Sequence, residues 1–266
     1  MKLTTIFFLL LLPFAVCAVV QEHESHGRNV LILADKSDEM PELRQRIQSG
    51  GWTTTQLAQN DWNVSSTGFD AIVVYIHEPI IETVEKALID YAEQGGRLLV
   101  VHHALASAKM QNPRWLEFLG VQLAAKTSPD APWFVSGDVA FTVVNLAPKH
   151  YITSHGVKYD KTIAYRSATQ RKLDGEFPAF VLENSEIFHN QRNTDADAKI
   201  PLLAYCLDGS QSADLPANVP AFDEAAGWLK KTGKGWTVYL QPGHAATDFR
   251  HPAFGQILLN SLDWKE

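Results

Sequence analysis

Histidines and carboxylates gather at four places where an apolar run of the sequence ends. Imidazoles and carboxylates that are brought together can transfer protons or bind a metal ion. The sequence therefore predicts either general acid–base chemistry or a metal site. The candidate residues are His77, Glu78, His102, His103, Glu186, His189, His244 and Asp248.

The apolar runs that precede these residues have the length and composition of buried strands. They alternate with helical patterns, and strand–helix–strand units at this spacing indicate a parallel sheet. Ligands of such open sheets bind beyond the carboxyl ends of the strands, so the polar residues at these ends should converge on one pocket. We predict strands at 29–34, 52–57, 69–75, 97–101, 137–144, 179–188, 202–207 and 235–240, helices at 41–47, 79–94, 113–119 and 252–264, and a surface loop at 207–224.

Several candidates also have readings without a function. His102 and His103 are adjacent, so we expect at most one of the two rings to face the pocket. Glu186 could be a solvated carboxylate at a strand end, and His189 could be an exposed loop residue. His77 and Glu78 could lie at the rim, and His244 could cap the segment that follows it.

The first 27 residues have the layout of an export signal. A positive start is followed by an apolar run and then by small residues, which is typical of a secretory signal peptide. We predict a signal peptide at 1–18, a polar leader at 19–27 and one α/β domain at 28–266, with an exported, periplasmic or extracellular location. Cys17 could instead indicate a lipoprotein, but the residue before it fits that reading less well than a signal peptide. The second cysteine, Cys206, lies in an apolar run that predicts a buried structural thiol.

The charge of the chain excludes some classes of partner. Its formal net charge is −7, and no cluster of Lys and Arg is present that would bind nucleic acid. The first apolar run is too short for a comfortable membrane span, and no further apolar run reaches spanning length. The sequence also lacks the nucleophile elbow of α/β-hydrolases, a phosphate-binding loop and a dinucleotide fingerprint.

The carboxy-terminal part carries a specific order of motifs. A Gly-x-Gly strand at 233–239 leads to Gly243-His244 and then to His251-Pro252-Ala253-Phe254. This order resembles the closing segment of ThuA-like (trehalose-utilisation) proteins. The Gly-Gly, apolar strand and His element that ends at His102 is similar to that family's pattern, as is the Glu186 motif, in which Ser185 and Phe188 replace the usual Asp and Tyr.

The resemblance implies a three-layer α/β fold with an open, mostly parallel sheet, flavodoxin-like and related to class I glutamine amidotransferases. His102 stands where those enzymes have a nucleophilic cysteine, so we expect no glutaminase activity. The positions carried over as catalytic are His102, Glu186 and His244. The other candidates would bind substrate, and these are His77, Glu78, His103, His189 and Asp248.

Membership of this family implies carbohydrate metabolism, with disaccharides and their 3-keto derivatives as substrates. We expect proton transfer next to a carbonyl, giving isomerisation, elimination or hydrolysis. His102 and Glu186 would be base and acid, and His244 would orient the substrate or stabilise an enolate oxygen. A divalent metal such as zinc could take that last role.

Two alternatives remain at this point. A non-catalytic sugar-binding protein would use aromatic faces, for which Trp62, Trp115 and Trp133 are the candidates. A redox protein would use Cys206. The oligomeric state stays open.

Overall fold

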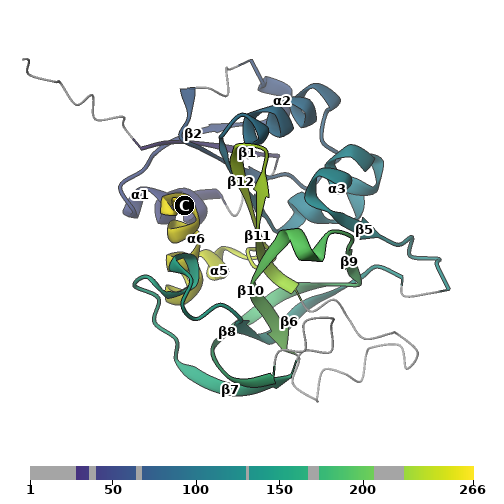
Figure 1. Ribbon diagram of the computed structural model, residues 1–266. Coiled ribbons are helices and arrows are strands. Elements are labelled where there is room, and N and C mark those ends of the chain that lie inside the picture. The colour runs from purple at the N-terminus through teal and green to yellow at the C-terminus, as the bar shows by residue number, and fades with distance from the viewer. Residues whose placement is uncertain (1–27, 36–39, 64–67, 130–131, 167–173, 207–224) are drawn as a thin grey trace, which may run out of the picture.

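The fold is built around one mixed sheet of ten strands, seen in a computed structural model (Figure 1). The structure describes residues 28–35, 40–63, 68–129, 132–166, 174–206 and 225–266. The predicted signal peptide and leader at 1–27 and the predicted loop at 207–224 lie outside these residues. No helix of the described ranges is long and apolar enough to cross a membrane.

Five neighbouring strands of the sheet are parallel, in the order β2-β1-β3-β4-β12. This is the flavodoxin-like strand order, and it confirms the predicted α/β fold class. The strands are short, and the side chains of all of them except the edge strand β2 are almost all buried, as the apolar runs predicted. They are β1 (Asn29–Ala34), β2 (Thr53–Leu57), β3 (Ala71–Tyr75), β4 (Arg97–Val101) and β12 (Gly235–Leu240).

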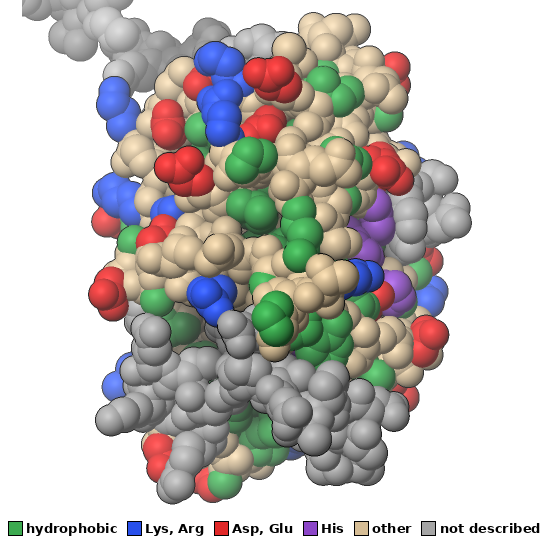
Figure 2. Space-filling model, turned by 90° about the vertical axis from the view of Figure 1, so that its right-hand side faces the viewer, with side chains coloured by type: hydrophobic (Ala, Val, Ile, Leu, Met, Phe, Trp, Pro, Cys, Tyr) green, Lys and Arg blue, Asp and Glu red, His purple; other side chains and the backbone are tan. Residues whose placement is uncertain are grey.

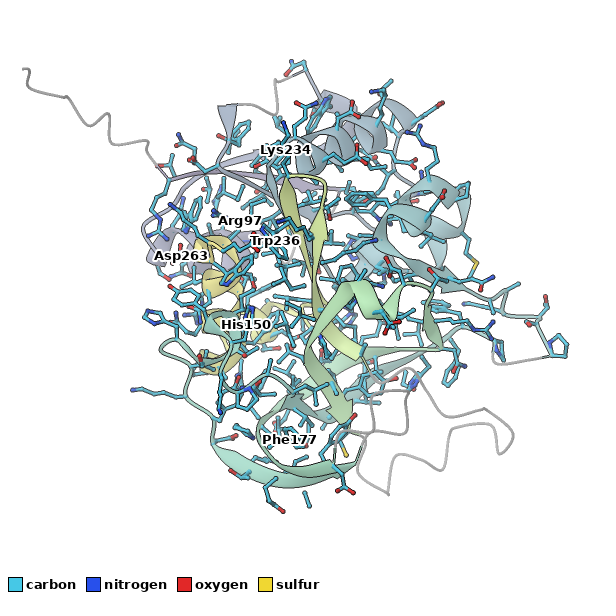
Figure 3. The ribbon with its side chains drawn as sticks, viewed as in Figure 1. Arg97, His150, Phe177, Lys234, Trp236 and Asp263 are labelled. Atoms are coloured by element: carbon cyan, nitrogen blue, oxygen red, sulfur yellow. The ribbon has the colours of Figure 1, made fainter. Side chains whose placement is uncertain are left out.

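The other half of the sheet is antiparallel, and the sequence predicted only part of it. Its order is β11-β10-β6-β8-β7, joined to the parallel half through the β11–β12 hairpin, whose turn holds Lys234 (Figure 3). The long strands β6 and β8 pair along most of their length. These strands are β6 (Phe134–Asn145), β7 (Lys161–Arg166), β8 (Asp174–His189), β10 (Lys199–Cys206) and β11 (Ala225–Thr232), while β5 (Val121–Leu123) and β9 (Gln191–Asn193) form a separate small sheet.

Helices cover both faces of the parallel strands, which makes three layers (Figure 1). Side chains of a strand alternate between its two faces, so Val30 and Ile32 belong to one core cluster, and Leu31 and Leu33 to the other. On the first face lie α1 (Met40–Ser49) and α6 (Pro252–Asp263), and on the second lie α2 (Glu82–Glu93) and α3 (Pro113–Leu119). Two shorter helices are α4 (Tyr151–Ser154) and α5 (Ala246–Arg250).

Two glycine motifs of the sequence pack against each other where β4 and β12 begin. A Cβ atom on Gly235 would lie 2.2 Å from the carbonyl oxygen of Gly96, and one on Gly96 would lie 2.4 Å from the ring of Tyr91. Only glycine permits this approach of two backbones. The contact sets β12 beside β4, and the register of this pair brings Leu240 opposite Val101. The residues that follow both strands are therefore neighbours.

Candidate functional site

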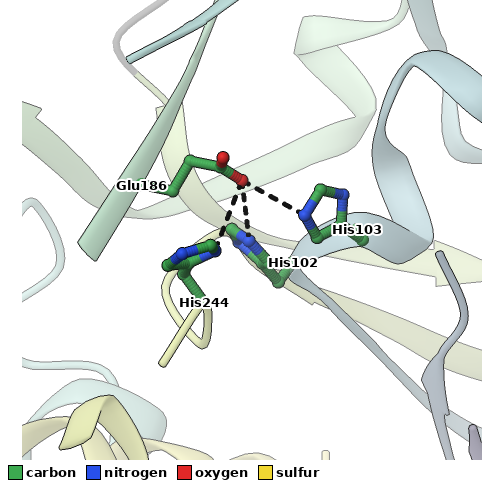
Figure 4. Close-up of side chains that lie close together, drawn as sticks. All are labelled: His102, His103, Glu186 and His244. Atoms are coloured by element: carbon green, nitrogen blue, oxygen red, sulfur yellow. Dashed lines mark ion pairs between the residues drawn. The ribbon is translucent and has the colours of Figure 1, made fainter. Parts of the chain in front are cut away.

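Four side chains converge beyond the carboxyl ends of β4 and β12, as the sheet topology predicted (Figure 4). His102 and His103 follow β4 and begin a short 3-10 helix, and His244 follows β12. Glu186 comes from the antiparallel strand β8. The structure thus brings together residues 58 or more positions apart that the sequence proposed as catalytic, together with His103.

Both adjacent histidines take part, so the expectation that only one ring would face the pocket is wrong. Nε2 of His102 and Nε2 of His103 each lie 3.2 Å from Oε2 of Glu186. His102 has a left-handed backbone with φ = 50°, which is uncommon for a residue with a Cβ atom. This turn directs both rings towards Glu186, with an angle of 84° between their planes.

His102 is fully buried and its tautomer is fixed. Its Nδ1 lies 2.7 Å from the carbonyl oxygen of Gln241, which can only accept a hydrogen bond, so Nδ1 carries the proton. Burial lowers the pKa of His102 to about 3, although the contact with Glu186 acts in the opposite direction. The ring is therefore neutral at physiological pH, and the lone pair of Nε2 points at the Glu186 carboxylate.

Glu186 is the centre of the cluster. Its Oε2 faces all three imidazoles, since Nδ1 of His244 lies 3.5 Å away. Burial alone would raise the pKa of Glu186, but the contacts with His102, His103 and His244 hold it well below its usual range. Glu186 is therefore ionised, and burial lowers the pKa of His103 despite the nearby carboxylate.

The loop that carries His244 is fixed by Asp248. One carboxylate oxygen, Oδ2, accepts hydrogen bonds from the backbone N–H groups of Gly243 and His244, both at 3.0 Å, and from the hydroxyl of Ser185 at 2.7 Å. Asp248 is buried, which raises its pKa. Asp248 thus connects the His244 loop to Ser185, the residue before Glu186, and it supports the cluster without being one of its members.

Gly243 should be essential for the position of His244. Its φ is 124°, and a Cβ atom there would lie 2.9 Å from Cγ1 of Val101 and 3.2 Å from the ring of Phe249. We expect Gly243→Ala to destabilise the fold by about 1–3 kcal/mol and to displace His244. Urea unfolding measures the first effect, and the turnover assay proposed below measures the second.

A matched control is Gly156→Ala, which replaces another left-handed glycine, with φ = 68°. Its Cβ atom would meet only the flexible side chain of Gln256, at 3.6 Å. This variant should lose stability without losing activity. Equal activity losses in both variants would show that the close contact at Gly243 does not position the site.

His77 and Glu78 lie beside the cluster, at the carboxyl end of β3. The ring of His77 packs on that of His103, with centroids 4.2 Å apart. Asp35 accepts the backbone N–H groups of His77 and Glu78 at 2.6–2.8 Å and contacts Nδ1 of His77 at 3.2 Å. Glu78 is exposed, as expected for a rim residue.

Sequence reasoning missed three residues that hold the site in place. Asp35 directly follows β1, so the carboxyl-end rule would have found it. Gln241 directly follows β12, and its amide donates to the backbone oxygen of Glu186 at 2.6 Å. Lys109 is fully buried, and its ammonium donates to the carbonyls of Ile76, His77 and Glu78 at 2.8–3.2 Å.

His189 is not part of the cluster, and it is buried rather than exposed. It stands three residues after Glu186 on β8, where alternation turns it to the other face of the strand. Its Nε2 lies 3.0 Å from the hydroxyl of Ser136 and its Nδ1 lies 3.4 Å from that of Tyr205, and the ring stacks on Phe134.

Burial of His189 should make the protein sensitive to acid. Burial lowers its pKa to about 4, whereas the ring titrates near 6.5 in the unfolded chain. As the pH falls from 6.5 to 4, the unfolded state takes up a proton that the folded state does not, so stability decreases, by up to about 3 kcal/mol. Urea unfolding across this range should show a smaller decrease for His189→Gln, and an unchanged decrease would contradict this origin.

The three tryptophans named as sugar-binding candidates do not form an exposed stacking surface. Trp115 is fully buried and its Nε1 donates to the carbonyl of Ala104, and Trp133 is 2% exposed. Trp62 is half-buried against a core cluster. Cys206 lies at the end of β10 and is half-buried, not fully buried as the sequence predicted.

The convergent groups can do two kinds of chemistry. An ionised carboxylate beside several imidazoles can accept and relay protons. The same atoms, Nε2 of His102, Nε2 of His103, Nδ1 of His244 and a carboxylate oxygen of Glu186, could hold a metal ion, because the group's ligand atoms all lie within 4.8 Å of one another. The side chains of His103 and His244 are 23% and 32% exposed, so the site is open to a ligand. Figure 2 shows histidine side chains at the surface of the molecule.

Comparisons with known proteins agree with the motifs of the sequence. A protein-family model described as "Trehalose utilisation" (ThuA) matches residues 33–265. No curated protein matches the chain.

Solved structures agree in fold. A putative ThuA-like protein from Parabacteroides merdae ATCC 43184 has a TM-score of 0.62 and 12% identity, covering 89% of this chain and 88% of that one. One from Bacteroides uniformis ATCC 8492 has a TM-score of 0.55 and 15% identity, covering 88% and 89%. The protein STM1381 from Salmonella typhimurium LT2 has a TM-score of 0.56 and 13% identity, covering 88% and 98%.

Proposed function

Because this chain belongs to the ThuA family of trehalose-utilisation proteins, we propose that it is a carbohydrate-processing enzyme whose active site is the cluster around Glu186. The single observation that carries the proposal is the convergence of three imidazole nitrogens within 3.5 Å of one buried carboxylate oxygen. Titratable groups with shifted pKa values that meet within hydrogen-bond reach mark a candidate functional site.

The substrates that fit the family are disaccharides and their 3-keto derivatives. A carbonyl acidifies the C–H bond beside it, so an ionised carboxylate can remove that proton, and isomerisation or elimination then follows. Glu186 is the candidate base because it is ionised: burial favours its protonated form, but the contacts with His102, His103 and His244 hold its pKa below the usual range. His103 and His244 are the candidate donors to the developing enolate oxygen, because their side chains are 23% and 32% exposed and can reach a ligand.

His102 has a different role in this proposal. Its Nδ1–H is held by the carbonyl of Gln241 and its ring is fully buried, so it positions Glu186 instead of moving protons to a substrate. His77 and Glu78 lie at the rim, where they would contact the sugar. The leader-like residues 1–18 support export of the enzyme, which N-terminal sequencing of the secreted protein would test.

The experiment is an NMR turnover assay of the purified protein with free and 3-keto disaccharides. We expect new product signals with the 3-keto sugar, and loss of these signals with His102→Ala. Glutamine should not be hydrolysed, because an imidazole at position 102 cannot form a thioester. If no sugar is turned over but ligand signals broaden in the presence of protein, the chain is a binding protein and the proposal fails.

A further inference from the structure

The two most buried atoms of the cluster face each other without a hydrogen bond. Nε2 of His102 and Oε2 of Glu186 have no hydrogen-bond partner among the described residues, although they lie 3.2 Å apart. The proton of His102 is on Nδ1, held by Gln241, so Nε2 offers a lone pair. A lone pair and a carboxylate oxygen repel each other unless a cation lies between them, and a buried unsatisfied pair of this kind is costly.

The spacing of the group is that of atoms that share an ion. Nitrogen and oxygen ligands lie about 2.0–2.2 Å from Zn²⁺, so two ligands at a tetrahedral angle lie about 3.3–3.5 Å apart. The distances from Oε2 of Glu186 to the nitrogens of His102, His103 and His244 are 3.2, 3.2 and 3.5 Å. None of these contacts gives Oε2 a hydrogen bond, and all three distances fit ligands of one ion.

The residues behind the cluster have the arrangement that metal sites use. A histidine ligand usually donates its second N–H to a carbonyl or carboxylate, which fixes the tautomer. His102 donates to Gln241, and Gln241 in turn donates to the backbone oxygen of Glu186. The His244 loop is fixed by Asp248, and two such ligands are therefore oriented before any ion binds.

We propose that His102, His103, His244 and Glu186 bind one divalent transition-metal ion of the zinc type. Three imidazole nitrogens exclude Ca²⁺ and Mg²⁺ as the preferred ion, because these take oxygen ligands. The four ligand atoms all lie within 4.8 Å of one another, and a zinc ion that takes a fifth ligand would have a further position for an oxygen of the substrate or of water. That position lies on the side of the half-exposed His103 and His244, where a sugar would arrive.

The inference deepens the proposed function, because it names the ion at the same site, but its test does not need turnover. The protein is stripped with EDTA and titrated with ZnCl₂ by calorimetry. Cobalt(II) is then used as a spectroscopic probe, since imidazole ligation gives visible absorption bands. We expect one equivalent of either ion per chain, and at least about 100-fold weaker binding for Glu186→Gln and His102→Ala.

Two further variants serve as controls for unfolding and for metal binding outside the cluster. His103→Ala changes a half-exposed ligand, so it should weaken binding without unfolding, as circular dichroism would show. His155→Ala removes an exposed histidine outside the cluster and should bind like the wild type. Absence of binding by the wild type, or equal binding by all variants, would overturn the inference.

The metal and the sugar chemistry can fail separately. If the protein binds one ion per chain but turns over no sugar, the metal site stands and the proposed function is wrong. If the stripped protein turns over sugar and added zinc does not change the rate, the proposed function stands and the metal site is wrong.

Discussion

Glu186→Gln should reduce the turnover of a 3-keto sugar by at least about 1,000-fold while the fold stays intact. The substitution keeps the shape of the side chain and removes its negative charge. It takes away the oxygen that three imidazoles face at 3.2–3.5 Å, which is both the candidate base and a candidate ligand. Loss of a general base alone costs about 10²–10⁴-fold.

The measurement is kcat/KM by NMR, with thermal unfolding recorded on the same sample. Glu183→Gln is the matched control, because Glu183 is an exposed carboxylate on the same strand, three residues earlier. It should keep the wild-type rate. Comparable rates in Glu186→Gln and the wild type would show that the cluster takes no part in the reaction.

Lys109→Met should cause the largest loss of stability among substitutions close to the site. The ammonium group is fully buried and donates to three backbone carbonyls at the end of β3. Methionine fills a similar volume but leaves these carbonyls without their donor. Each buried unsatisfied group costs about 1–3 kcal/mol, so we expect a loss of at least about 3 kcal/mol in the free energy of unfolding.

This prediction is checked by urea unfolding at pH 7, with Lys86→Met as the control. Lys86 is exposed on α2 and forms a surface ion pair with Asp90, so its loss should change stability by less than about 0.5 kcal/mol.

Burial lowers the pKa of Lys109 to about 8, although the negative charges of Asp35 and Glu78 act in the opposite direction. Between pH 8 and 10.5 the unfolded state binds the extra proton, so wild-type stability should rise with pH there. Identical unfolding curves for the wild type and Lys109→Met would contradict the role of Lys109.

The parallel half of the sheet could be predicted from sequence because four of its five strands are short apolar runs. The bounds of Arg97–Val101 and Gly235–Leu240 match the prediction, since strands buried on both faces show no other pattern. The antiparallel strands β7 and β11 were missed. Lys161–Arg166 alternates weakly, and Ala225–Thr232 ends in polar residues.

The site was predictable where residues follow parallel strands directly. His102 and His244 are of this kind, and the family motif added Glu186. The face of a residue on β8 could not be predicted in the same way, because this strand pairs with β6 through irregular registers. His189 was therefore expected near the pocket although it lies on the other face. Lys109 donates hydrogen bonds to backbone carbonyl groups. Every residue has such a group, so no sequence pattern identifies the partners of Lys109.

The central claim, that Glu186 and three histidines form one metal-binding active site, is tested most directly by X-ray diffraction. Crystals of the zinc-loaded protein would be measured on both sides of the zinc absorption edge, together with crystals of Glu186→Gln. We predict one anomalous peak within about 2.0–2.3 Å of the nitrogens of His102, His103 and His244 and of a Glu186 oxygen, and no peak in the variant. A peak elsewhere, or a wild-type map with no peak between these residues, would contradict the account.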